Sequence, residues 1–254
     1  MTFLLGGSLG VTRLLFRSNA VRNFKQDWRV WALGIGGLFG YHLIYFTAIR
    51  ITPAVEVSLI AYLWPLFLVV FSTFLPNEKL HRHHVVGVIM GLSGAGLIIS
   101  KGNISGVFQN FSFGHLLAFI CAVIWASYSV LSRRFRNAPV ELVSGFCLAT
   151  AALSLIAHLV FETTVWPQLP TQWLAVLGLG LLPVGLAFYT WDYGVKHGDI
   201  MVLGAASYAA PLLSTLVLVS VGHTIFTWII SAGCLLITAG AVIAAKDMIS
   251  KKPI

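Results

Sequence analysis

Aromatic side chains lie deep inside long apolar stretches of this sequence, where they can contact a bound organic molecule. Trp64 and Trp125 stand in the middle of such stretches rather than near their ends. A buried indole needs a partner for its N–H, and this favours the wall of a polar cavity over a packed core. Trp125 and Tyr128 are three residues apart and therefore share one face of a helix. The alternative role for each ring is packing against a neighbouring helix or lipid.

Hydroxyl groups and one histidine are the other candidates for contact with a ligand. Tyr41, His42 and Tyr45 lie within one short stretch. His42 can take up a proton or bind a carboxylate, although a single histidine in an apolar segment more often hydrogen-bonds a neighbouring helix. The residues predicted to contact a substrate are Tyr41, His42, Tyr62, Trp64, Trp125, Tyr128, Tyr189, Ser207 and Tyr208.

Two prolines, Pro65 and Pro211, fall within predicted helices. A proline inside a helix has no N–H for the backbone ladder and deprives one carbonyl of its usual partner. In transporters such breaks line the substrate cavity, whereas in other membrane helices they are tolerated as kinks. We predict that both prolines break helices at a cavity and take part in gating.

Acidic residues are scarce inside the apolar stretches, and Glu56 and Asp192 are the two nearest to them. Glu56 is expected to stabilise the start of a helix, with attraction of a substrate ammonium as the alternative. Asp192 is expected to pair with Lys196, four residues on, with proton binding as the alternative. No metal site and no cofactor are predicted, because the histidine cluster at 81–84 has no cysteine or carboxylate at ligand spacing except Glu78.

The composition predicts a membrane protein. Hydrophobic residues make up 58% of the 254 residues and charged residues only 9%, against about 25% in soluble domains. The net charge of +8 does not indicate nucleic acid as a partner, because the basic residues form short clusters between apolar stretches. No GxSxG or HExxH motif and no paired intramembrane carboxylates occur, so an enzyme is not expected.

Nine stretches are apolar enough to be transmembrane helices, which need about 20 residues. The lipid bilayer is therefore the expected surrounding of most of the chain. The predicted spans are Met1–Phe16, Val30–Ile49, Ser58–Leu75, Val85–Ser100, Gly114–Ser132, Glu141–Phe161, Trp173–Val195, Ile200–Gly222 and Ile225–Ala244.

The basic residues predict the orientation of these spans. When the connections are assigned to alternate sides, only Arg50 and Lys101 of the 16 lysines and arginines fall on one side. The side with the other fourteen is predicted to be cytoplasmic. This places the C-terminus in the cytoplasm and Met1 outside.

The chain also repeats itself with an offset of 146 residues. Tyr62–Pro65, with the sequence YLWP, returns as YAAP at Tyr208–Pro211. The same offset places Gly87 on Gly233 and Gly94 on Gly240. Equivalent residues fall on opposite membrane sides, so the repeat is predicted to be inverted, as in secondary transporters. The first repeat is assigned to residues 1–104 and the second to residues 105–254.

The repeat predicts one more helix than the sequence shows. Gly114–Ser132 would have its partner before Met1. We therefore expect an all-α, polytopic bundle of ten helices in an inverted five-plus-five arrangement, of which nine are visible here. The visible helices would be the second to fifth and the sixth to tenth.

Three segments resemble the EamA-type drug/metabolite transporters, and among them the aromatic amino-acid exporter (YddG-like) branch. They are VEVSLIAYLWP at Val55–Pro65, FICAVIWASY at Phe119–Tyr128 and FYTWDYGVKHG at Phe188–Gly198, the last followed by AASY and Pro211. The resemblance implies ten helices, a central cavity and export of amino acids from the cytoplasm across a bacterial inner membrane. The chain departs from the branch at Ala205–Ala206, where a Gly-containing pair is usual.

The predicted function is therefore secondary export of amino acids or similar small metabolites by alternating access. Because the sequence contains no P-loop, energy is expected from the substrate gradient or from protons. The alternative within transport is export of amines or drugs, nucleosides or sugars. A membrane-embedded enzyme or a receptor is the remote alternative.

Overall fold

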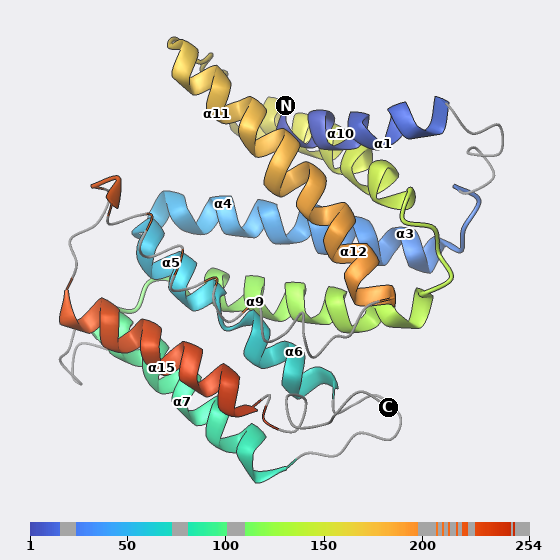
Figure 1. Ribbon diagram of the computed structural model, residues 1–254. Coiled ribbons are helices and arrows are strands. Elements are labelled where there is room, and N and C mark those ends of the chain that lie inside the picture. Colours follow the sequence, from blue (N-terminus) through green and yellow to red (C-terminus); the bar gives the residue numbers. More distant parts are fainter. Residues whose placement is uncertain are drawn as a thin grey trace. The chain divides into compact units, whose positions relative to one another are not determined.

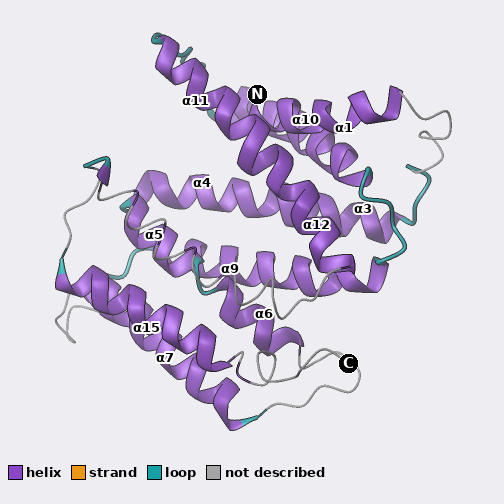
Figure 2. Cartoon of the chain, viewed as in Figure 1, coloured by secondary structure: helices purple, strands orange, loops and turns teal. Residues whose placement is uncertain are grey.

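The computed structural model describes residues 1–15, 24–72, 81–100, 110–197, 207, 210, 213, 217, 220–222, 227–244 and 246. These residues form helices joined by short turns, with no strand among them (Figure 2). The all-α fold class predicted from the composition is thus confirmed. Most of the predicted span Ile200–Gly222 lies outside the described residues, as does the predicted repeat boundary at residues 104–105.

Eight of the nine predicted spans contain a described helix (Figure 1). Five of these spans are long and apolar enough to cross a bilayer, and the other three are shorter apolar helices. The α-helices are α1 (Thr2–Leu15), α3 (Trp28–Ile35), α4 (Tyr41–Ile51), α5 (Ala54–Ala61), α6 (Trp64–Ser72), α7 (Arg82–Ser100), α9 (Phe113–Ser132), α10 (Leu142–Phe161), α11 (Pro170–Leu181), α12 (Ala187–His197) and α15 (Trp228–Ala244). Three short segments continue them: the π-helices η1 (Gly36–Gly40) and η3 (Leu182–Leu186) and the 3₁₀ turn η2 (Arg133–Phe135).

The chain forms two compact units. Unit 1 contains Met1–Leu43 and Leu131–Gly198, and unit 2 contains Ile44–Val130 and Asp199–Ile254. In unit 1, α1 packs against α10 and α11. A side chain at Gly6 would collide with the Val184 carbonyl of η3, so the missing side chain permits this close approach. Each unit draws helices from both predicted repeats.

In unit 2, α7 and α15 lie side by side and antiparallel (Figure 1). A Cβ at Gly94 would be 2.8 Å from the Gly233 carbonyl oxygen, and one at Gly240 would be 2.6 Å from that of Gly87. The offset of 146 makes Gly94 the equivalent of Gly240 and Gly87 the equivalent of Gly233. The repeat therefore exchanges the Gly94–Gly233 contact with the Gly240–Gly87 contact, as a twofold axis does.

The two π-helical segments are also related by this offset. η1 spans Gly36–Gly40 and η3 spans Leu182–Leu186, and both ends differ by 146 residues. The helices that follow, α4 and α12, begin and end at equivalent residues as well. The local sequences differ, GGLFG against LPVGL, so the shared distortion belongs to the repeated fold rather than to one amino-acid pattern. Such π segments are rare and occur often at functional sites.

The α7–α15 crossing gives a prediction for stability. Gly94→Ala is expected to lower the free energy of unfolding by about 1–3 kcal/mol, because its methyl group would press on backbone that cannot rotate away. Gly96→Ala on the same helix is the control. No atom lies within 4 Å of a Cβ at Gly96, so alanine should be neutral or stabilising by up to about 1 kcal/mol. Thermal unfolding in detergent measures both, and equal midpoints would contradict the close crossing.

Candidate functional site

The span that contains Pro65 is broken in two. α5 ends at Ala61, Tyr62 and Leu63 form a turn, and α6 begins at Trp64. The sequence predicted one span, Ser58–Leu75, with a helix break at Pro65; the turn lies at Tyr62 and Leu63, just before the proline. Pro65 occupies the first turn of α6. Backbone N–H groups in the first turn have no intrahelical acceptor, so the N–H that proline lacks costs no hydrogen bond there. In transporters, discontinuous helices of this kind contribute backbone groups to the substrate site.

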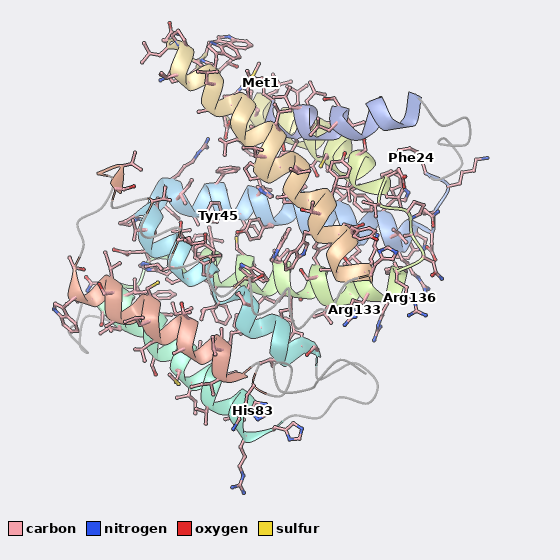
Figure 3. The ribbon with its side chains drawn as sticks, viewed as in Figure 1. Met1, Phe24, Tyr45, His83, Arg133 and Arg136 are labelled. Atoms are coloured by element: carbon pink, nitrogen blue, oxygen red, sulfur yellow. The ribbon has the colours of Figure 1, made fainter. Side chains whose placement is uncertain are left out.

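Polar and aromatic side chains gather beside this break in unit 2. The hydroxyls of Tyr45 on α4 and Ser58 on α5 are 2.9 Å apart, and Tyr45 is labelled in Figure 3. The Tyr45 hydroxyl is also within electrostatic range of Tyr62 and Cys121. Cys121 is on α9, one helical turn before Trp125. On this basis we call Tyr45, Ser58, Tyr62, Trp125 and Tyr128 the aromatic cluster.

Trp125 and Tyr128 are the two members of the aromatic cluster on α9. Their ring centroids are 5.4 Å apart, as their three-residue spacing requires. Tyr128 is 5% exposed, while Trp125 and Trp64 are partly exposed. A partly exposed ring next to a buried one offers an edge that a ligand can contact. Tyr45 contacts Ser58, and Trp125 contacts Tyr128. Tyr45 and Ser58 are two polar residues absent from the predicted substrate contacts.

His42 lies in a separate ring cluster in unit 1. Its centroid is 4.8 Å from Phe3, 5.0 Å from Tyr41 and 5.8 Å from Phe188. Phe188 is the repeat equivalent of His42, 146 residues on, so here a residue faces its own equivalent. His42 Nδ1 donates to the Leu38 carbonyl oxygen at 2.7 Å, and Leu38 belongs to η1. The π segment therefore holds the imidazole in one orientation.

Other predicted contact residues have different surroundings. The Tyr189 hydroxyl donates to the Gly6 carbonyl at 3.0 Å and lies against Gly10, so it joins α12 to α1. Ser207 is partly exposed. Tyr208 and Pro211 lie outside the described residues, and their substrate and gating roles stay predictions.

The predicted ion pair between Asp192 and Lys196 is present on α12. Lys196 Nζ lies 2.8 Å from Asp192 Oδ2, and the two side chains are 4% and 2% exposed. Nζ also donates to the Ala138 carbonyl at 3.1 Å. Each charge thus has a partner of opposite sign, and the hydrogen bond from Lys196 to Ala138 joins α12 to the turn between α9 and α10.

A second polar pair includes a residue that the sequence analysis did not single out. His115 on α9 is 3% exposed, and its Nε2 lies 2.8 Å from Glu56 Oε2. Glu56 stands in the first turn of α5, the helix-start position expected for it. The two residues are 59 apart in sequence, so no local pattern links them. A histidine near the start of an apolar stretch is the only signal the sequence offers.

No group of three or more histidine, cysteine or acidic side chains is close enough to hold a metal ion in the described part of the chain. The rings of His81 and His83 stack with their centroids 5.5 Å apart. The prediction of no metal or cofactor rests on the sequence.

Comparison with known proteins identifies relatives over nearly the whole chain. An aromatic amino acid exporter, YddG of Ancylobacter novellus, is 49% identical over 245 residues, which cover 96% of this chain and 85% of the relative. YddG of Salmonella typhimurium is 26% identical over 168 residues, 64% of this chain and 57% of the relative. An uncharacterized transporter, YyaM of Bacillus subtilis, is 25% identical over 96% of this chain and 79% of the relative.

A solved crystal structure shares the fold, with a TM-score of 0.76 and 50% sequence identity over 96% of this chain and 85% of that one. The model of the EamA-like transporter family matches residues 1–100 and 112–245. These matches cover the apolar helices, the broken span at Pro65 and both π segments. The chain therefore belongs to the EamA-like transporter family.

Proposed function

We propose that this protein is a secondary transporter that exports neutral amino acids, aromatic ones included, across a bacterial inner membrane. The observation that carries the proposal is the aromatic cluster beside the broken α5–α6 span. It combines large rings with hydroxyl groups at the depth where transporters bind their substrates. The names of the relatives, aromatic amino acid exporters, support the same substrate class.

The aromatic cluster suits the two parts of such a substrate. The rings of Trp125 and Tyr128 can pack on an apolar side chain, and an indole face attracts an ammonium group. The Tyr45 and Ser58 hydroxyls can donate to a carboxylate. Trp64 follows the helix break directly and is expected to contact the same substrate. The cluster contains no charged side chain, so it favours a neutral, zwitterionic amino acid over a cation.

His42 is proposed as a second recognition residue. The hydrogen bond from Nδ1 to the Leu38 carbonyl fixes the orientation of the ring. The surrounding rings of Phe3, Tyr41 and Phe188 suit an apolar substrate side chain. Tyr41, His42 and Tyr45 stand on consecutive turns of α4.

Alternating access is proposed as the mechanism. Each repeat contains a π segment followed by an eleven-residue helix. Because a π segment replaces regular α-helical bonds, it is a place where a helix can bend at low cost. We propose that η1 and η3 bend in turn as the site opens to one side and then the other.

The proposed orientation places the C-terminus in the cytoplasm. Arg133, Arg134 and Arg136 gather at the turn that follows α9, where Arg133 and Arg136 are labelled in Figure 3. A basic cluster at one end of an apolar helix marks the cytoplasmic side. The opposite end, with Glu56 and His115, then faces outward.

Exchange in proteoliposomes tests the proposed function. Vesicles loaded with unlabelled tryptophan should take up labelled tryptophan, and methionine and alanine should compete. Lysine, an amine, a nucleoside and a sugar serve as further competitors. If folded protein exchanges no amino acid, the proposal is contradicted. If only the amine or only the sugar competes, the substrate belongs to that class instead of the amino acids.

A further inference from the structure

Three arginines gather at one end of the helices of unit 1. α9 ends at Ser132, and the turn that follows carries Arg133, Arg134 and Arg136. Arg134 and Arg136 are exposed, and Arg133 is partly exposed. The ion pairs formed between described residues include none of these three arginines. Their charges are therefore available to an anion from outside the protein.

The packing of unit 1 brings the start of α3 to the same end. The ring centroids of Trp31 and Phe146 are 5.4 Å apart, and a Cβ at Gly145 would collide with the Trp31 ring. Gly145 and Phe146 belong to the first turns of α10, which begins shortly after η2. The exposed side chains of Lys25 and Arg29, at the start of α3, therefore lie at the end of α10 that η2 precedes. We call Lys25, Arg29, Arg133, Arg134 and Arg136 the basic patch.

Few carboxylates oppose the charge of the basic patch. Asp27 precedes α3, but its Oδ1 accepts the backbone N–H of Arg29 at 3.0 Å and caps the helix. The Asp192 carboxylate is neutralised by Lys196. Glu141, which is partly exposed, is the other acidic side chain at this end of unit 1 in the described part of the chain. The patch thus keeps an excess of positive charge.

Apolar and aromatic side chains adjoin these charges. Leu131 is 37% exposed and stands three residues before Arg134, so the two side chains share one face. Trp28 is 71% exposed, and the Arg29 guanidinium carbon lies 6.0 Å from the centroid of its ring. Indole rings favour the depth of the lipid headgroups in a bilayer. A ligand that fits this surface has both an anionic group and an apolar part, as a phospholipid does.

We propose that the basic patch binds the headgroup of an anionic phospholipid of the surrounding bilayer. Guanidinium groups donate paired hydrogen bonds to phosphate oxygens, and Leu131 and Trp28 contact the apolar part of the same lipid. In the proposed orientation the patch lies in the cytoplasmic leaflet, whose surface is negatively charged. A soluble anion would use the charges but not their apolar neighbours. The inference depends on placement in a membrane and not on which substrate is exported.

Titration of phosphatidylglycerol into delipidated protein tests the proposal. The full chain is held in an uncharged detergent, and binding is followed by the thermal midpoint and by native mass spectrometry of the retained lipid. Phosphatidylglycerol should raise the midpoint by several degrees, because a ligand of the folded state stabilises that state. Phosphatidylcholine at the same mole fraction should leave the midpoint unchanged. Added salt should weaken the binding of phosphatidylglycerol, since it screens exposed charges.

The double variant Arg134→Gln with Arg136→Gln removes two of the charges. Each basic residue near an anionic surface is worth about fivefold in affinity, so this variant should bind phosphatidylglycerol about 25-fold more weakly. Its midpoint without lipid should match the wild type, because both side chains are exposed. Arg134→Lys with Arg136→Lys keeps the charges and should retain most of the affinity. Arg50→Gln is the matched control, since Arg50 is exposed at the other end of the span Trp28–Ile51 and its loss should not change binding.

Three results would overturn the lipid site. Equal stabilisation by phosphatidylglycerol and phosphatidylcholine would show that the headgroup charge is not recognised. Stabilisation by soluble glycerol phosphate as large as that by phosphatidylglycerol would assign the patch to a free anion. Unchanged affinity in the folded Arg134→Gln, Arg136→Gln variant, or an equal loss in Arg50→Gln, would place the binding elsewhere. If the double variant does not fold, Arg29→Gln repeats the test and should weaken binding about fivefold.

Discussion

Trp125→Ala is expected to reduce tryptophan exchange in proteoliposomes by about five- to thirtyfold. Trp125 is partly exposed beside the buried ring of Tyr128, so it presents an aromatic surface that alanine cannot replace. Loss of ring packing and of attraction for the substrate ammonium amounts to about 1–2 kcal/mol, and each 1.4 kcal/mol is a factor of about ten in affinity. The effect should appear as a raised half-saturating concentration.

Two comparisons separate a substrate contact from a structural role. Trp125→Phe keeps a ring without the N–H and should retain an intermediate rate. Trp228→Ala removes an indole that is 66% exposed at the start of α15 and should leave exchange unchanged. Equal loss in all three variants, or a fall in thermal midpoint for Trp125→Ala that matches its loss of activity, would contradict the assignment.

Lys196→Ala is expected to be the most destabilising single change in unit 1. It would leave the Asp192 carboxylate, which is 2% exposed, without its partner, and would remove the tie to Ala138. Breaking one side of a buried ion pair costs about 3–5 kcal/mol. We expect a low yield of monodisperse protein and a reduced thermal midpoint in detergent.

Removing both charges tests this explanation. The double variant Asp192→Asn with Lys196→Met leaves no uncompensated charge, so its midpoint should lie between those of Lys196→Ala and the wild type. Lys25→Ala is the matched surface control, because Lys25 is exposed in a loop of the same unit and should shift the midpoint little. A double variant as unstable as Lys196→Ala would show that packing, and not charge, maintains this region.

The sequence by itself determined the features that depend on local physics. Transmembrane helices need about 20 apolar residues, and this length requirement located eight spans that contain a described helix. Four-residue spacing predicted the Asp192–Lys196 pair. Three-residue spacing predicted the shared face of Trp125 and Tyr128. Motifs at Val55–Pro65 and Phe188–Gly198 indicated the family, which the comparisons confirm.

The tertiary structure decided what depends on contacts between distant residues. The repeat identified Gly94 and Gly240 as equivalents, but only the antiparallel crossing shows that Gly94 meets Gly233. The π segments carry different sequences, so their shared distortion was invisible to pattern analysis. His115 and Glu56 are 59 residues apart, and the packing of α9 on the α4–α5 turn brings them together. Spacing along one helix can be read from a sequence, whereas the partner that a side chain meets across a helix interface is chosen by packing of the whole fold.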